Sequence, residues 1–123
     1  MKSDAHEFRS GCSIARSLEL IGDKWTLLII RDLIWHEKRT FQALQSSAEH
    51  IPTNLLSQRL KKLIEWQLVR REVYQDKPIR YTYHLTEAGQ NLENVLLQIM
   101  NWGHVHLGGG HYDPQTKRSR PSS

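Results

Sequence analysis

The stretch TNLLSQRLKKLIEWQLVRREVYQDKPIRYTYHL, residues 53–85, decides the fold of this chain. Its first part has a helical period, because Leu60, Leu63 and Ile64 follow Leu56 by four, seven and eight positions along one apolar stripe. Its second part alternates apolar and polar side chains in two runs, LVRREVYQ and IRYTYHL, which the turn sequence QDKP separates. The stretch therefore predicts an amphipathic helix followed by a β-hairpin with a charged tip.

The polar side of this predicted helix has the chemistry of a DNA-binding surface. Asn and Gln can pair with adenine through two hydrogen bonds, Ser reaches base edges or phosphates, and Arg and Lys favour guanine or the phosphate backbone. In the hairpin, Lys77 at the tip and Arg80 beside it can reach a neighbouring groove. A solvent-facing amphipathic helix would show the same stripe, so the stripe alone does not decide. The candidate helix residues are Asn54, Ser57, Gln58, Arg59, Lys61 and Lys62.

Positive charge is concentrated in the same stretch. The chain of 123 residues has a formal net charge of +4, and residues 59–80 alone hold seven basic and three acidic side chains. A positive stripe on a nearly neutral body is expected of a protein that binds a phosphate backbone. A protein-interaction module built on the same scaffold is the alternative from another class, but it gives no reason for this placement of charge.

Helical spacing predicts further elements on both sides of the stretch. Residues 12–21 form a predicted helix that ends at Gly22, and Asp23 can cap a second helix over the almost wholly apolar run WTLLII. Thr40 can cap a short third helix, and Thr86 can start a long last helix after the hairpin.

The last predicted helix has more apolar side chains than one face against a small core needs. The surplus predicts a second buried surface, covered by a partner or by a second subunit. The residues concerned are Leu92, Val95, Leu96, Leu97, Ile99, Met100 and Trp102.

The element order is helix, helix, short helix, polar-striped helix, hairpin and long helix, which is the order of a winged helix-turn-helix domain. We therefore predict a mainly α fold with a small β-hairpin wing, in one DNA-binding and dimerisation domain over residues 1–110. Residues 111–123 are rich in Pro and basic side chains and are predicted to form a flexible basic tail.

Composition argues against several other classes of protein. A single cysteine cannot form an intrachain disulfide or a Cys-rich zinc module. No apolar run is long enough to span a bilayer, and the N-terminus lacks the apolar core of a signal peptide. We expect a cytoplasmic protein without a membrane partner.

Neither a metal site nor a catalytic centre is predicted. His104, His106 and His111 are loosely spaced around a glycine run, and Cys12 is far from them in sequence, unlike the ligands of structural zinc sites. A thiol-dependent enzyme is a weak alternative, because no histidine is placed as a base for Cys12 and no Gly-rich oxyanion element is present. The expectation is no enzyme activity, no metal and no cofactor.

Three sequence blocks are distinctive: CSIARSLELIGDKWTLLIIRDL, LLSQRLKKLIEWQLVRREVY and YTYHLTEAGQNL. They resemble the HxlR-type family of bacterial transcriptional regulators, which is related to the MarR group, and the resemblance covers roughly residues 8–107. The chain departs from the family pattern at the first helix, where Cys12 is followed by Ser13 and not by the proline common in the family.

The resemblance implies a homodimeric winged helix-turn-helix regulator that binds palindromic double-stranded DNA. Repression follows where such an operator overlaps a promoter. It implies that residues 53–66 are the recognition helix, that residues 70–85 are the wing, and that the N-terminal segment and the last helix form the dimer interface. Matched by position, the resemblance implies that the residues at the DNA are Thr53, Asn54, Ser57, Gln58, Arg59 and Lys62, with Lys77 and Arg80 in the wing.

Two interpretations of Cys12 stay open. It is either a small residue that packs the first helix, or a thiol that senses oxidants or electrophiles. A helix N-terminus stabilises a thiolate, and the resemblance implies that the second role is open to this chain, because several HxlR-type regulators sense through a cysteine at this place. A small-molecule effector is a further open alternative.

Overall fold

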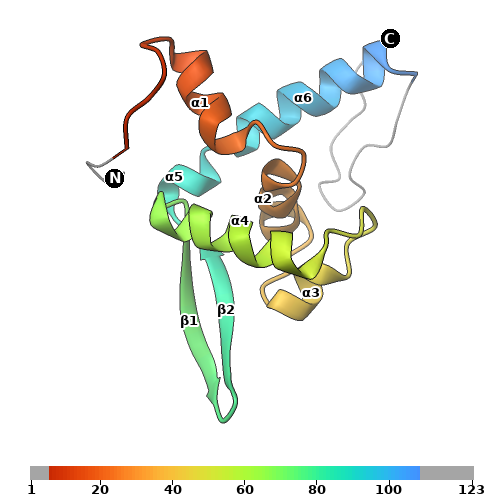
Figure 1. Cartoon of the computed structure of the whole chain (residues 1–123). Helices are drawn as coiled ribbons and strands as arrows, with labels where there is room; N and C mark the ends of the chain where they lie inside the picture. The colour runs from red at the N-terminus through yellow and green to blue at the C-terminus, as the bar shows by residue number, and fades with distance from the viewer. Residues whose placement is uncertain (1–5, 109–123) are drawn as a thin grey trace.

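A computed structural model of the chain describes residues 6–108, and the predicted basic tail at residues 111–123 lies outside this range (Figure 1). The element order confirms a mainly helical domain with a hairpin wing. The elements are α1 (Ser13–Ile21), α2 (Thr26–Trp35), α3 (Phe41–Gln45), α4 (Thr53–Glu65), β1 (Val69–Asp76), β2 (Ile79–Leu85), α5 (Glu87–Gln90) and α6 (Glu93–His106).

The core forms around α2, as its all-round apolar sequence predicts. Ile29, Ile30 and Leu33 of α2 are buried among apolar side chains from most other elements. Burying side chains of this size contributes roughly 1.5–3 kcal/mol each. The other core residues are Trp35, Leu44, Ile51, Leu56, Leu60, Leu63, Trp66, Leu68, Val69, Tyr83 and Leu96.

Polar side chains start three of the helices as the sequence predicts. Asp23 accepts hydrogen bonds from the backbone N–H groups of Trp25 and Thr26 ahead of α2, at 3.0 and 3.1 Å. Thr40 Oγ1 accepts from the N–H of the third residue of α3, and Thr86 Oγ1 accepts from the N–H of Gly89. These side chains satisfy N–H groups that have no partner within their own helix.

The single long helix predicted after Thr86 is corrected by the structure, which divides it into α5 and α6. Leu92 N–H donates to Gly89 O, three residues back, so the chain tightens before α6 begins. α5 packs closely under the base of the wing, because a Cβ on Gly89 would overlap the carbonyl oxygen of Leu68. Helical periodicity continues through the break, so the sequence pattern did not reveal it.

The two strands form an antiparallel hairpin that projects from the body of the molecule (Figure 1). Pairing runs from Val69 opposite Leu85 to Asp76 opposite Ile79, with a bulge at Tyr74. The base of β2 is fixed to the body, because Tyr83 N–H donates to the carbonyl of Arg39 at 2.7 Å. None of the described helices has the length and apolar character needed to cross a membrane.

Candidate nucleic-acid interface

The helix α4 exposes a polar face of short and long side chains. Its apolar side is buried through Leu56, Leu60 and Leu63. The exposed residues recur at helical spacing and so share one face of the helix. This face consists of Thr53, Asn54, Ser57, Gln58, Lys61 and Glu65.

The exposed start of α4 is tied to α3. Gln45 is the last residue of α3, and its Nε2 donates a hydrogen bond to Oγ1 of Thr53, the first residue of α4, at 2.5 Å. The two helices are joined in the helix-turn-helix arrangement, in which the second helix enters a DNA groove. Gln45 therefore sets the position of one predicted DNA contact.

An ionic cluster around the buried Asp32 of α2 holds the turn between α3 and α4. The fully buried Asp32 accepts a hydrogen bond from Ser47 Oγ and pairs with Arg31 at 2.9 Å. The Arg31 guanidinium also bonds both carboxylate oxygens of Glu49, at 2.8 and 2.9 Å. These hydrogen bonds from Arg31 lower the pKa of Glu49 to about 2, even though partial burial opposes the shift.

Arg59 and Lys62, which the sequence predicts to lie at the DNA, have partners within the chain. Arg59 Nε pairs with Asp23 Oδ2 at 2.8 Å, and Lys62 Nζ donates to the backbone carbonyl of Glu19 at 2.9 Å. Both side chains are half-buried against the N-terminal part of the chain. The structure thus separates these two cations from the exposed face of α4, because the helix turns them towards α1 and the loop that follows it.

The carboxylate of Asp23 connects α2 and α4. Burial by itself raises the pKa of Asp23, but hydrogen bonds from Thr26, Arg59 and the backbone N–H of Trp25 outweigh burial and lower it to about 2. The ionised form is therefore the one that the fold stabilises.

We predict that the free energy of unfolding decreases as the pH falls from about 4 to about 2. The pKa of Asp23 is lower in the folded chain than its ordinary value of 3.8, so its contribution is complete above that value and disappears as the carboxylate protonates. Asp23→Asn retains an accepting oxygen but cannot titrate, and should flatten this part of the curve. Glu49 retains its own share of the pH dependence. Urea midpoints at about pH 5, 3.5 and 2.5 check this, and an unchanged curve in the variant would contradict it.

The outer part of the wing is solvent-exposed on both strands. Every residue from 70 to 80 is exposed, and Lys77 lies in the turn between β1 and β2. Arg80 pairs across the hairpin with Gln75, next to the bulge at Tyr74. Both predicted wing cations are therefore free of the protein core and close to the tip.

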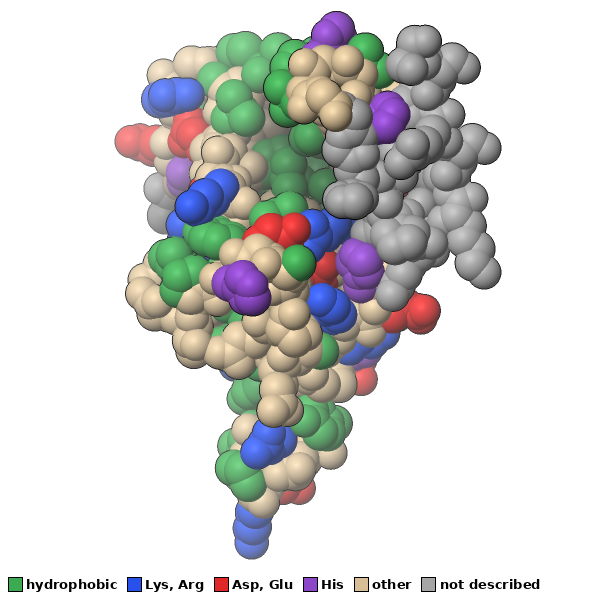
Figure 2. All heavy atoms as spheres, turned by 90° about the vertical axis from the view of Figure 1, so that its right-hand side faces the viewer, with side chains coloured by type: hydrophobic (Ala, Val, Ile, Leu, Met, Phe, Trp, Pro, Cys, Tyr) green, Lys and Arg blue, Asp and Glu red, His purple; other side chains and the backbone are tan. Residues whose placement is uncertain are grey.

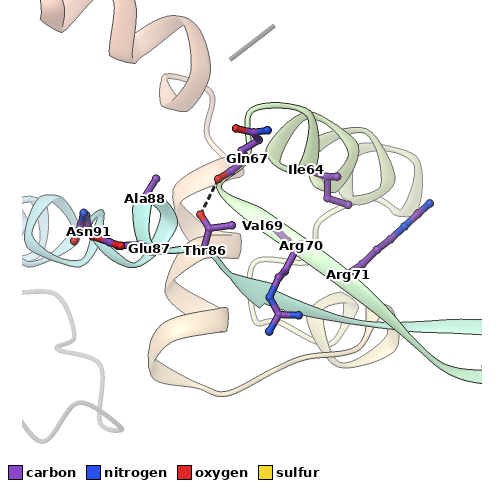
Figure 3. A pocket seen from close by; sticks show the side chains of 9 residues that line it. All are labelled: Ile64, Gln67, Val69, Arg70, Arg71, Thr86, Glu87, Ala88 and Asn91. Atoms are coloured by element: carbon purple, nitrogen blue, oxygen red, sulfur yellow. Dashed lines mark hydrogen bonds between the residues drawn. The ribbon is translucent and has the colours of Figure 1, made fainter. Parts of the chain in front are cut away.

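Arg70 and Arg71 lie on different sides of β1, as Figure 3 shows. Arg70 pairs with the carboxylate of Glu72, whereas the Arg71 guanidinium lies over the ring of Tyr81, 4.1 Å from its centroid. Both line an open recess of about 850 Å³ at the base of the wing, between the end of α4 and α5. Arg71, unlike Arg70, also lines a second recess, which lies between α4 and the wing.

That second recess, of about 330 Å³, lies between α4 and the wing. Its two cations come from α4 and β1, over a floor of aromatic and aliphatic side chains. The sequence predicts that at most one of Arg70 and Arg71 points at DNA, because neighbouring residues of a strand face opposite sides, and it gives no preference between them. Phe41 and Tyr83 were not predicted as site residues, because they come from separate elements and no periodic pattern links them to α4. The recess is lined by Phe41, Ser57, Leu60, Lys61, Ile64, Arg71 and Tyr83.

Cys12 is exposed, which argues against the packing interpretation. It is the N-cap of α1, its N–H donates to Ser10 Oγ at 3.0 Å, and its carbonyl accepts from the N–H of Arg16. The Arg16 guanidinium is directed to the carbonyl of Ser10 and to the ring of Phe8. Within residues 6–108, no three His, Cys, Asp or Glu side chains are grouped to hold a metal ion, and His111 lies outside that range.

Apolar side chains are exposed along α1 and α6, at the end of the molecule opposite the wing tip. Figure 2 shows hydrophobic side chains gathered at this end. Between α1 and α5–α6 lies an apolar groove of about 480 Å³. The exposed apolar residues are Ile14, Leu18, Val95, Ile99, Trp102, Val105 and Leu107.

The sequence is similar to a known protein family and to regulators within it. Residues 20–110 match the family model described as HxlR-like helix-turn-helix. An HTH-type transcriptional regulator of Mycobacterium tuberculosis, MT3179, is 40% identical over 84% of this chain, and the chain spans 63% of that relative's length.

Solved structures show the same similarity. The redox regulator HypR in its reduced form is 30% identical with a TM-score of 0.71, over 79% of this chain and 95% of that one. The reduced form of the transcriptional regulator YodB from B. subtilis is 28% identical with a TM-score of 0.62, over 83% of this chain and 100% of that one.

Proposed function

The chain belongs to the HxlR-like helix-turn-helix family of transcriptional regulators, and we propose that it binds a palindromic DNA operator as a homodimer. Its family consists of transcriptional regulators, and we expect no enzyme activity from it. Where the operator overlaps a promoter, binding represses transcription. Because DNA is the proposed target, the proposed place of action is the cytoplasm.

One observation supports DNA binding most strongly. The exposed face of α4 and the exposed wing border the same recess, with Lys61 on one side and Arg71 on the other. A DNA strand between a groove-bound helix and a wing would meet cations from both. The wing adds Lys77 and Arg80 near its tip, where they can contact phosphates or an adjacent groove.

We assign the α4 residues two different roles. The exposed residues, Thr53, Asn54, Ser57, Gln58 and Lys61, contact DNA directly, with Asn54 and Gln58 suited to adenine. Arg59 and Lys62 stay with Asp23 and Glu19 and position the helix.

The proposed dimer uses α1 and α6. Their exposed apolar side chains, such as Ile14 and Trp102 at 71% and 58% exposure, form the second buried surface that the sequence composition predicts. A two-fold dimer presents two α4 helices to half-sites roughly 10 bp apart or a multiple of that. We propose residues 1–110 as this binding and dimerisation domain, followed by the basic tail at residues 111–123.

The test is selection of bound fragments from random duplex DNA with the purified protein, followed by a salt titration. We expect a palindromic consensus sequence. Four phosphate contacts per subunit, from Lys61, Arg71, Lys77 and Arg80, give a slope of log affinity against log salt of about −7 for the dimer. No enrichment together with a slope near zero would reject DNA binding and favour the protein-interaction module.

We also propose that Cys12 makes DNA binding responsive to oxidants or electrophiles. The thiol is exposed at the start of α1, beside the proposed dimer surface, and the similar protein HypR is named a redox regulator. Because each chain has one cysteine, oxidation by diamide forms a disulfide between chains or with a small thiol. Either product places new atoms at the edge of the dimer interface.

We predict that diamide weakens operator binding by the wild type and leaves Cys12→Ser unchanged. A coupling free energy of about 1–3 kcal/mol is typical of such switches, so the expected loss is roughly 5- to 150-fold. Mobility-shift titrations with and without diamide, each followed by a reducing control, measure it. If the wild type and Cys12→Ser bind the operator with the same affinity and neither affinity changes with diamide, Cys12 has no sensing role.

A further inference from the structure

The N-terminal part of the chain lies against one flank of α4. Arg59, Lys62 and Trp66 follow one another at spacings of three and four, so they share a side of the helix. Arg59 pairs with Asp23 and Lys62 donates to the carbonyl of Glu19. This flank is distinct from both the buried stripe and the exposed polar face of α4.

The third contact is aromatic and involves residues that precede α1. The rings of His6 and Phe8 meet Trp66, the C-cap of α4, edge to face with centroids 4.9 and 5.8 Å apart. The Arg16 guanidinium lies over the ring of Phe8, 4.7 Å from its centroid. Such ring pairs contribute about 0.5–1.5 kcal/mol beyond the area they bury.

Glu19 holds the segment before α1 in this position. Its carboxylate accepts a hydrogen bond from the backbone N–H of Arg9 at 3.0 Å and lies 3.2 Å from Nε2 of His6. The carbonyl of the same residue receives Lys62. One residue of α1 therefore joins the segment at residues 6–10 to the side of α4.

We propose that residues 6–23 act as a brace that sets the orientation of α4 about its own axis, so that Phe8, Glu19 and Asp23 are positioning residues for DNA recognition. The inference rests on the proposed DNA binding by α4. A helix that rotates by a fraction of a turn moves Asn54 and Gln58 away from base edges, whereas lysine contacts to phosphates tolerate the change. Loss of the brace should therefore lower sequence preference more than overall affinity.

The test uses full-length Phe8→Ala, with Phe8→Tyr as the variant that keeps the ring. Hydrogen exchange is measured on the DNA-free proteins, and affinity is measured for the fragment selected by the wild type and for a scrambled duplex. In Phe8→Ala we expect amides at residues 59–65 to exchange roughly three- to tenfold faster, and the preference for the selected fragment to fall by a similar factor. Phe8→Tyr should keep the wild-type exchange rates and the wild-type preference for the selected fragment.

Trp35→Phe serves as a control for general destabilisation. It removes the hydrogen bond from Trp35 Nε1 to Glu93 at 2.8 Å, and Trp35 lies in α2, outside residues 6–23. An equal loss of preference in this control, or unchanged exchange at residues 59–65 in Phe8→Ala, would overturn the proposal. A wild type without preference for any fragment would instead reject the proposed function, and the exchange data would still decide whether the brace orders α4.

Discussion

Replacing Gly89 with alanine should lower the free energy of unfolding by about 1–3 kcal/mol, the usual cost of overpacking. A Cβ at this position would overlap the backbone carbonyl of Leu68 and lie 2.9 Å from Cδ2 of Leu85. The carbonyl belongs to the chain that enters β1 and accepts the N–H of Thr86 at 3.0 Å, so it cannot move without disturbing the base of the wing. Urea unfolding at fixed protein concentration measures the loss.

Gly103→Ala is the matched control and should raise the free energy of unfolding. Gly103 lies within α6, and a Cβ there would meet only Cδ1 of Leu107 at 4.0 Å. Alanine in a helix interior is more stable than glycine by roughly 0.5–1 kcal/mol. Equal effects of the two substitutions would show that backbone packing at Gly89 is not the cause.

Asn54→Ala should remove about 2–6 kcal/mol of discrimination between the operator and scrambled DNA. Asn54 is exposed in the first turn of α4, and a bidentate contact with adenine contributes about 1–3 kcal/mol of discrimination at each half-site. A homodimer loses this contact twice. Binding to scrambled DNA should stay nearly unchanged, because the side chain has no charge for phosphates.

Lys61→Ala is the comparison that separates recognition of bases from attraction to phosphates. Lys61 lines the recess between α4 and the wing, so its loss should weaken binding to both DNAs alike and reduce the salt slope by about 2 for the dimer. Competition titrations at several salt concentrations measure both quantities. A parallel loss on both DNAs in Asn54→Ala would contradict base recognition by that residue.

The order of elements followed from local patterns because those patterns act over a few residues. The apolar stripe from Leu56 to Ile64 predicts α4, the alternation across residues 68–85 predicts the wing, and Asp23, Thr40 and Thr86 cap helices as expected. The break between α5 and α6 did not follow, because helical periodicity continues through residues 87–106 and does not show the tightened turn in which Leu92 N–H donates to Gly89 O.

The sequence by itself determined the family, the fold and the exposed polar face of α4, since helical periodicity fixes which side chains share a side. Only the tertiary structure decided which cations of α4 pair within the chain and which stay exposed. Arg59 and Lys62 belong to the same helix as Lys61, yet α1 and the loop after it occupy them, and Arg71 joins Lys61 because the wing folds back beside α4. The physical reason is that a charged side chain takes the partner that lies nearest in space, and for Arg59 that partner is 36 positions away along the chain.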